Sequence, residues 1–352
     1  MNSRGSQTGE RKRRAQPTID DVAIAAGVST ATISRTLNDP KRVSVKTREK
    51  VMAAVDQLGY QPNFSAKALA ASKTGTVGAI IPTMDNAIFA RGLQAFQEEL
   101  GEHGYTMLVA SSSYHPALEA QQIRNLVARG VDALMLIGTD RGDDIYNYLE
   151  TRSIPIVTAW SFQDGATIPC IGFDNRDAMA QLTRRVLSLG HRHLGIISAP
   201  RAHNDRARER VEGALEAVGQ AGIARDTVPI LEVNYSIANG ARAFAALMRE
   251  PTPPTAILCG NDVLAVGALG KARQMGLSVP KDVSITGFDD IELAEVSYPP
   301  LTTVHVPHRQ MGRAAAQILM KLVSGEELSG NAALKTRIIE RGTLAGPTDL
   351  QA

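Results

Sequence analysis

The chain has 352 residues, of which 43% are hydrophobic and 4% aromatic, and its formal net charge is +2. This length exceeds one ordinary domain and suits a small domain joined to a larger, bilobed one. No run of about 18 apolar residues is present, so we expect no membrane span. The polar, basic N-terminus does not resemble a secretory signal, and we therefore expect a cytoplasmic protein.

Positive charge is concentrated at the start of the chain. Residues 1–74 contain 13 Lys and Arg against 6 Asp and Glu, whereas the remainder is net negative. Such a concentration of cations is what contact with nucleic-acid phosphates requires. The leader at 1–16 has no apolar periodicity, and we predict that it is disordered. Its run Arg11-Lys12-Arg13-Arg14 either adds non-specific attraction to phosphates or has no dedicated role.

Residues 18–38 predict two short helices joined by a tight turn. Thr18 can cap the first helix with Asp21 three residues on, and Gly27 can end it in a left-handed conformation. Ser29 is placed to cap a second helix over about 30–37. Small residues before Gly27 let the helices cross closely, as in a helix-turn-helix that places its second helix in the DNA major groove. Taken alone, this segment also fits an αα-hairpin of an ordinary helical protein.

A third helix is predicted from about Val45 to Leu58, between Ser44 and Gly59. Its residues Val51, Val55 and Leu58 form one apolar face, which is enough to close a three-helix domain.

From about Thr74 the pattern alternates strands and helices, as in parallel α/β proteins. We predict strands at 77–81, 106–110, 133–137, 155–159, 194–198, 228–233, 256–259, 283–287, 301–306 and 335–339. The predicted helices are 87–103, 116–128, 143–151, 177–189, 205–221, 238–248, 263–275 and 307–323. The series restarts near Gly172, which indicates two lobes. Cys170 and Cys259 fall in apolar, strand-like runs and are predicted to be buried small side chains.

Ligands of open parallel sheets lie beyond the carboxyl ends of the strands, so residues there are candidates for a binding site. These positions hold Asp85, Asn86, Ile88, Phe89, Trp160, Asp174, Arg210, Tyr235, Asn261 and Asp289. Together they offer planar polar groups for the hydroxyls of a sugar and an aromatic face for its C–H side. The alternatives are structural: a surface ion pair for Arg210, helix caps for Asp262 or Asp290, and burial for Trp160.

Sequence motifs of common enzymes are missing. The chain has no Gly-x-Gly-x-x-Gly after its first strand, no Gly-Lys-Ser/Thr of a Walker loop and no Gly-x-Ser-x-Gly elbow. His191 and His193 lie in a helix-to-strand turn without a neighbouring set of metal ligands. We therefore predict no catalytic activity, no metal and no cofactor. A solute-binding protein for an importer is the alternative, but it would lack residues 18–70.

Several phrases, in order along the chain, identify a family. They are Asp-Val-Ala, Ala-Gly-Val-Ser, Ser-Arg-Thr-Leu-Asn, Val-Ser-x-Lys-Thr-Arg-Glu-Lys-Val and Leu-Gly-Tyr-x-Pro-Asn. Later come Arg-x-x-Gly at Arg210, Asn-Asp-x-x-Ala-x-Gly at Asn261 and Gly-Phe-Asp-Asp-Ile around Asp289. With these phrases the chain resembles the lactose-repressor (LacI/GalR) family of bacterial transcription regulators from residue 18 to about 343.

This resemblance implies a helix-turn-helix headpiece, a short hinge helix and an α/β core of the periplasmic-binding-protein type I fold. We place the leader at 1–16, the headpiece at 17–60, the hinge at 61–74 and the core at 75–345. Within the core, the first lobe would comprise about 75–173 and 306–334, and the second about 174–305 and 335–345.

The resemblance also implies a homodimer on a two-fold symmetric operator in double-stranded DNA, with one headpiece per half-site. The implied DNA contacts are Thr18, Ser29, Thr30, Ala31, Thr32, Ser34, Arg35, Asn38, Asn63 and Leu69. Thr30 and Ala31 can touch a thymine methyl group, whereas Arg35 can reach a guanine or a phosphate. Residues 63–71 are too few for a stable isolated helix, and we expect them to fold on DNA with Leu69 as a minor-groove wedge.

A small effector is implied between the lobes, in contact with Asn86, Phe89, Trp160, Asp174, Arg210, Tyr235, Asn261 and Asp289. Of these, Arg210, Asn261 and Asp289 match the family's effector-contacting arginine, asparagine and aspartate. We favour a sugar acid over a neutral sugar because a carboxylate can pair with Arg210, with Arg91 or His305 as further cations. Effector binding would rotate the lobes and change DNA affinity by a coupling of about 1–3 kcal/mol. The expected function is a ligand-responsive repressor of carbohydrate or sugar-acid genes.

Overall fold

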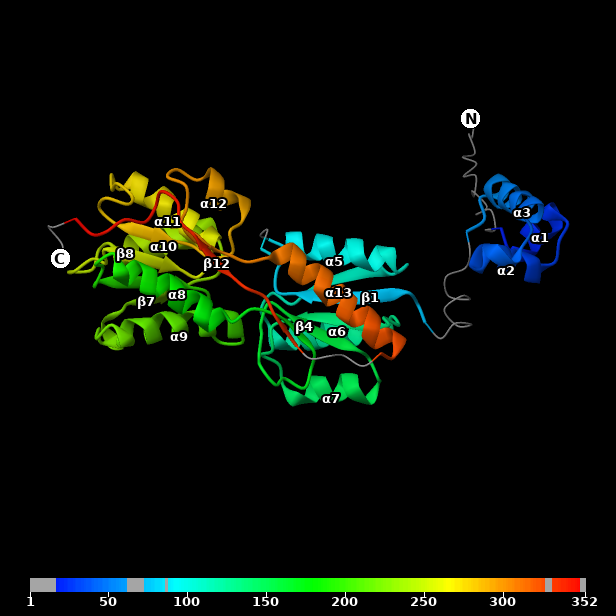
Figure 1. Ribbon diagram of the computed structural model, residues 1–352, viewed down its shortest axis with the longest axis horizontal. Helices are drawn as coiled ribbons and strands as arrows, with labels where there is room; N and C mark the ends of the chain where they lie inside the picture. The colour runs from blue at the N-terminus through cyan, green and yellow to red at the C-terminus, as the bar shows by residue number, and fades with distance from the viewer. Residues whose placement is uncertain (1–16, 62–72, 86–87, 327–330, 349–352) are drawn as a thin grey trace, which may run out of the picture. The chain divides into compact units, whose positions relative to one another are not determined.

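The computed structural model describes residues 17–61, 73–85, 88–326 and 331–348. It divides the chain into two compact units, with the boundary in the sequence between Thr74 and Gly75 (Figure 1). The predicted leader, the hinge residues Asn63 and Leu69, and the effector candidate Asn86 lie outside the described residues. Within the described ranges, no helix is both long enough and apolar enough to cross a membrane.

The first unit is a three-helix domain. Its elements are α1 (Ile19–Ala26), α2 (Thr30–Asn38), the short 3-10 helix η1 (Pro40–Arg42) and α3 (Val45–Leu58). Thr18 and Asp21 form the predicted capping box: Asp21 N donates to Thr18 Oγ1 at 3.3 Å, and Thr18 N donates to Asp21 Oδ2 at 2.8 Å. Gly27, with φ of 58°, ends α1 in the left-handed region. Ile33 and Val51 are fully buried in the shared core, which holds the three helices together.

The second unit alternates strands and helices as the sequence predicts. Its strands are β1 (Thr76–Ile81), β2 (Thr106–Ser111), β3 (Ala133–Ile137), β4 (Ile156–Ala159), β5 (Cys170–Gly172), β6 (Leu194–Ser198), β7 (Ile230–Glu232), β8 (Ala256–Cys259), β9 (Ser284–Thr286), β10 (Thr303–His305), β11 (Ala332–Ala333) and β12 (Arg337–Ile339). Its helices are α5 (Ala90–Glu102), α6 (Pro116–Ala128), α7 (Asp143–Thr151), α8 (Asn175–Ser188), α9 (Asp205–Gln220), η2 (Arg225–Thr227), α10 (Ile237–Leu247), α11 (Asp262–Gln274), α12 (Glu292–Val296) and α13 (His308–Ser324).

Two parallel sheets define two lobes. The first lobe contains a six-stranded sheet of order β11-β5-β4-β3-β1-β2, and the second contains a four-stranded sheet of order β7-β6-β8-β9. The antiparallel pair β10–β12 adjoins the second sheet through bridges from Thr286 to Thr302 and from Asp289 to His305. The chain passes between the lobes three times: between β5 and α8, between β10 and α13, and between β11 and β12.

Both sheets reverse their strand order, which fixes where a ligand can bind. In the first sheet the reversal lies between β1 and β3, and in the second between β6 and β8. The crevice at such a reversal, beyond the carboxyl ends of the strands, is the usual ligand position in open α/β sheets. The loops after β1 and β3 in the first sheet, and after β6 and β8 in the second, are therefore the ones expected to position a site.

Close helix packing completes the first lobe. Helices α5 and α13 lie side by side although more than two hundred residues separate them in the sequence (Figure 1). A Cβ atom on Gly312 of α13 would collide with the carbonyl oxygen of Gly92 in α5. Only glycine at 312 therefore permits this crossing.

Four elements of the second unit are not predicted by the sequence patterns: β5, η2, β11 and α12. Each is short, and β11 exists as two residues paired with Ile171 and Gly172 of β5. Helix α5 begins at Ala90, later than predicted, and Ala87 lies outside the described residues. Both cysteines are buried, as predicted, and neither forms a disulfide bond.

The buried side chain of His191 has a structural role. Its ring is buried, with Nδ1 2.9 Å from Thr255 Oγ1 and Nε2 2.7 Å from the carbonyl oxygen of Ala345. This residue thereby fastens the segment after β12 to the second lobe.

Candidate functional site

One face of α2 is exposed and carries the predicted recognition residues. Thr30, Ala31, Ser34 and Arg35 are exposed, whereas Thr36 on the other side of the helix is buried. This arrangement follows from the amphipathic pattern of α2, whose buried face packs into the three-helix core. The exposed face is the surface that a major groove could receive.

Of the remaining predicted contacts, Thr18 and Ser29 are helix caps, Thr32 lies in the first turn of α2, and Asn38 is the last residue of that helix. Ser29 Oγ accepts a hydrogen bond from Thr32 N at 3.2 Å and lies 2.9 Å from Thr32 Oγ1. Thr18 is occupied by the capping box of α1. The side chains of Thr18, Ser29 and Thr32 lie at helix N-termini, where backbone N–H groups also attract phosphates.

In the second lobe, Arg210 is buried at the centre of a polar cluster. Its Nε donates to Asn175 Oδ1 at 2.8 Å, its Nη1 to the Gly260 carbonyl at 2.7 Å, and its Nη2 to Asp289 Oδ1 at 3.3 Å. The guanidinium carbon lies 3.7 Å from the ring centroid of Phe288. These contacts fix the arginine in one orientation, and each of its three guanidinium nitrogens makes one of these hydrogen bonds.

Four buried side chains of this lobe have polar atoms without a partner in the described structure: Ser198, Asn261, Thr286 and Asp289. Asn261 caps α11 by accepting a hydrogen bond from Leu264 N at 2.9 Å, but its Nδ2 has no partner in the described structure. Asp289 is 1% exposed, and its Oδ2 is likewise unpaired within the described residues. Ser198 Oγ, at the end of β6, shares this condition. Buried polar groups normally have a hydrogen-bond partner. The amide donor of Asn261 and the carboxylate acceptor of Asp289 are therefore suited to bind a ligand.

Burial controls the protonation of the acidic groups. Burial raises the pKa of Asp289 to about 6, and Arg210 opposes this increase. Burial, together with the neighbouring Asp289, also raises the pKa of Asp262. Asp262 accepts from Thr303 Oγ1 at 2.5 Å and from Ile291 N at 2.8 Å, so it joins β10 and the loop before α12 to the start of α11.

A cavity of about 310 Å³ opens between the lobes, and Arg210, Asn261 and Asp289 are not among the residues that line it. Its walls come from the loops after β1 and β2 in the first lobe and from the loops after β6 and β7 in the second. Tyr114 and Tyr235 both line it and contact each other in a tilted arrangement, with ring centroids 5.9 Å apart. Burial raises the pKa of Tyr235, and the positive charge of Arg210 opposes this increase.

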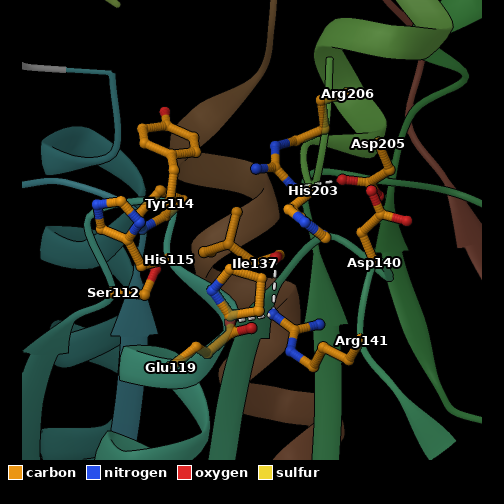
Figure 2. A pocket seen from close by; sticks show the side chains of 12 residues that line it. Ser112, Tyr114, His115, Glu119, Ile137, Asp140, Arg141, His203, Asp205 and Arg206 are labelled. Carbon is orange, nitrogen blue, oxygen red and sulfur yellow. Dashed lines mark hydrogen bonds and ion pairs between the residues drawn. The ribbon is translucent and has the colours of Figure 1, made fainter. Parts of the chain in front are cut away.

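A smaller pocket of about 20 Å³ lies on the other side of Tyr114, with room for one water molecule. Figure 2 shows Asp205 and Arg206 of the second lobe opposite Tyr114 and His115 of the first. The lobes are joined here, because Asp205 Oδ2 accepts from Ser161 Oγ at 2.7 Å and from Thr139 N at 2.9 Å.

Two family models cover almost the whole chain. Residues 18–63 match the bacterial regulatory proteins of the lacI family, and residues 74–340 match the periplasmic binding proteins and sugar-binding domain of the LacI family. The chain belongs to the LacI family.

Its relatives include the HTH-type transcriptional repressor CytR of Escherichia coli (strain K12), 30% identical over 95% of this chain and 98% of the relative. The HTH-type transcriptional regulator MalR of Streptomyces coelicolor is 35% identical over 87% of this chain and 90% of the relative. The lac repressor dimer bound to operator and the anti-inducer ONPF aligns with a TM-score of 0.84 at 27% identity, covering 94% of this chain and 100% of that one. This LacI-family protein is accordingly a DNA-binding transcription regulator with an effector-binding domain.

The structure bonds Arg210 to Asp289 and to the carbonyl oxygen of Gly260, which precedes Asn261. Of the predicted effector contacts that the structure describes, Tyr235 alone is among the residues that line the cavity. Asp174 is exposed and caps α8 by accepting from Asp177 N at 2.9 Å. Its neighbour Asn175 is the residue bonded to Arg210.

Phe89 and Trp160 belong to the first-lobe core rather than to the wall of the cavity. They are 3% and 1% exposed, with ring centroids 5.3 Å apart in an edge-to-face contact. Burial, the structural alternative for Trp160, is what the structure shows.

The two further cations expected near the effector are paired elsewhere. Arg91 Nη2 lies 2.9 Å from Glu292 Oε1, and His305 Nδ1 lies 2.8 Å from Asp290 Oδ2. Neither therefore supports the predicted preference for a sugar acid.

Sequence reasoning missed Tyr114, Asn175 and Arg206. Asn175 follows β5 and could have been found, because it immediately succeeds a predicted candidate. Tyr114 has φ of 60°, a left-handed backbone that is rare for a tyrosine, and no sequence pattern announces this turn.

Proposed function

We propose that this LacI-family regulator is a non-catalytic repressor whose effector is an uncharged, polyhydroxylated molecule bound between the lobes. The observation that carries this proposal is the pair of unpaired buried atoms, Asn261 Nδ2 and Asp289 Oδ2, in the lobe whose Tyr235 lines a cavity of about 310 Å³. One is a donor and the other an acceptor, which suits hydroxyl groups because each hydroxyl both donates and accepts.

The charge balance of the cluster favours a neutral ligand. Arg210 is paired with Asp289, and Arg206 Nη1 lies 2.6 Å from Asp205 Oδ1. A ligand carboxylate would therefore meet no unpaired cation among these groups, and it would lie near the carboxylate of Asp289. Desolvating a charge without a partner is costly, so a sugar acid should bind less well than the corresponding neutral sugar.

The comparisons support a sugar-like effector. The core matches a model described as a sugar-binding domain. The transcriptional regulator CelR in complex with cellobiose aligns at a TM-score of 0.66 and 28% identity over 93% of this chain. Tyr235 and Tyr114 offer ring faces to the C–H side of a sugar.

The effector proposal is tested by thermal shift of the full chain with glucose, maltose, cellobiose, uridine and gluconate. We expect a neutral probe to raise the midpoint, because a ligand at about 100 times its Kd adds roughly 2.7 kcal/mol. Asp289→Asn should abolish that shift, whereas Asp174→Asn, on the exposed cap, should retain it. A shift produced by gluconate alone would contradict the neutral-ligand proposal.

For DNA, we propose that dimers bind a two-fold symmetric operator through the exposed face of α2. Arg35 would read a guanine, while Thr30, Ala31 and Ser34 would lie along the groove. Thr18, Ser29, Thr32 and Asn38 would contact the backbone, and Asn63 and Leu69 of the hinge enter this proposal through the family resemblance.

Selection from a random DNA library should return a symmetric site. Arg35→Ala should then weaken binding to that site by about 1–3 kcal/mol and relax the preference at one base pair per half-site. Lys46→Ala, which removes an exposed cation from α3, is the charge-matched control and should weaken all sequences alike. Equal effects of the two variants on sequence preference would contradict the role of α2.

A further inference from the structure

His308 connects the two lobes at the point where the chain returns from β10 to α13. It is the first residue of α13 and is 4% exposed. Trp160 Nε1 donates to His308 Nδ1 at 3.2 Å, and His308 Nε2 lies 3.1 Å from the carbonyl oxygen of Asp289. Because an indole N–H can only donate, Nδ1 must accept and Nε2 must carry the proton given to Asp289. One imidazole thus joins the first-lobe Trp160 to the second-lobe Asp289.

Both ends of this connection have a backbone conformation that is rare for residues other than glycine. Trp160 has φ of 66° and Asp289 has φ of 103°. Such conformations persist where surrounding contacts over-determine them, and they gather at binding and switch regions. His308 contacts each of them directly, through the indole in one case and the carbonyl oxygen in the other.

The surroundings of Trp160 extend the connection into the first lobe. A Cβ atom on Gly92 would collide with the Trp160 ring, and another on Gly312 would collide with Gly92. Trp160 is therefore packed against the crossing of α5 and α13. Since packed interfaces of this kind shift between discrete arrangements rather than deforming smoothly, a displaced Trp160 would move this helix pair.

We propose that His308 is a positioning residue that holds Asp289 in place and couples it to Trp160, so that a change at the effector cluster reaches the α5–α13 crossing. The proposal rests on the proposed function only in taking Asp289 as an effector contact. The coupling itself is a property of the chain without ligand. It requires a side chain that accepts on one side and donates on the other.

The single tryptophan of the chain makes the proposal measurable. The indole N–H of Trp160 gives one resonance in a ¹⁵N–¹H spectrum of the full-length protein. We expect His308→Leu, which fills the space without hydrogen bonding, to move this resonance upfield and to speed its exchange with solvent. His308→Gln retains an acceptor and a donor and should keep the resonance near its wild-type position. A wild-type resonance in His308→Leu would overturn the proposal, as would identical spectra of the two variants.

A second comparison tests the far end of the connection. Asp289→Asn weakens the contact with Arg210 and should move the Trp160 resonance through His308. Asp290→Asn alters the adjacent residue, which pairs with His305 and Arg341, and should leave that resonance unchanged. No shift in Asp289→Asn would refute the coupling even if His308→Leu did not fold. Because these spectra need no effector, they can hold while every sugar probe fails, which would reject the effector assignment and retain the coupling.

Discussion

The two lobes share an architecture but differ in what they bury toward the cleft. In the first lobe, Phe89 and Trp160 pack as an apolar edge-to-face pair, and Tyr114 provides the cavity wall. The second lobe instead buries the polar side chains Arg210, Asn261 and Asp289. Of these, Asn261 and Asp289 each have one polar atom without a partner in the described structure. Lobes built on similar sheets therefore differ in chemistry: the second buries the polar groups of the proposed effector site, whereas the first buries an apolar aromatic pair.

The largest effect should follow from removing the cation of the second lobe. Arg210→Met leaves the Asp289 carboxylate, the Asn175 amide oxygen and the Gly260 carbonyl without their donor. Breaking a buried pair in this way costs about 3–5 kcal/mol of unfolding free energy, measurable by urea titration.

The matched change in the first lobe is Arg141→Met. Its partner Glu119 has a side chain 16% exposed, against 1% for Asp289, so water can reach the acid that is left behind. We expect a smaller loss than for Arg210→Met. Equal losses would mean that the second lobe is not distinguished by its buried charges.

A substitution at the crossing of α5 and α13 tests the first lobe. Gly312→Ala places a methyl group against the Gly92 carbonyl oxygen, and such overpacking costs about 1–3 kcal/mol. Gly101→Ala, on α5 with no atom near the added methyl, should instead stabilise by about 0.5–1 kcal/mol. Thermal or urea unfolding measures both. A stabilising Gly312→Ala would disprove the tight crossing.

The pH dependence of stability distinguishes the contribution of Asp289 from that of His308. The pKa of Asp289 is raised by burial from 3.8 to about 6, so the native state binds more protons in this window and stability falls as pH rises. The pKa of His308 is lowered by burial from 6.5 to about 4, so the unfolded state binds more protons and stability rises with pH.

These two contributions oppose each other between pH 4 and 6. Relative to wild type, His308→Gln should make stability fall with rising pH, and Asp289→Asn should make it rise. Each slope should be at most about 1.4 kcal/mol per pH unit. Urea titrations at pH 4.5, 5.25 and 6 compare the variants. Parallel curves for wild type and both variants would show that neither group is shifted as the structure implies.

The smallest effect concerns an ion pair that spans the lobes. Arg208 bonds Asp140 of the first lobe at 2.8 and 3.0 Å, whereas Arg201 bonds Glu232 within the second lobe. The two pairs are similarly exposed. Double-mutant cycles should give each about 0.2–1 kcal/mol. Only the Arg208–Asp140 cycle should change hydrogen exchange in both lobes, and an effect confined to one lobe would rule out its bridging role.

Much of the fold could be predicted because its signals are local. Thr18, Gly27 and Ser44 mark helix ends through their own hydrogen bonds and φ angles, and α3 has the predicted bounds. The two residues of β11 form a strand only because β5 lies beside them. Pairing of that kind depends on tertiary contact, which a local pattern does not contain.

The residues of the candidate site also differ in whether a local sequence signal could predict them. Arg210, Asn261 and Asp289 could be predicted because they follow strands within family motifs. Position after a strand does not determine which way a side chain points, so Trp160 and Phe89 were expected at the cavity although both lie in the core. The contact of Asp205 with Thr139 and Ser161 joins residues far apart in the sequence, and no local signal anticipates it.

The threefold passage of the chain between the lobes has a consequence for synthesis on the ribosome. Residues 17–61 can close their three-helix core as soon as they emerge, because its contacts are local. The first lobe cannot follow directly, since α13 and β11 are translated after the whole of α8 through β10. Its apolar sheet face therefore stays uncovered while about 130 further residues are added, roughly 7–26 s at 5–20 residues per second. During that interval a nascent chain can present a finished DNA-binding headpiece on a core that is still unable to bind its effector.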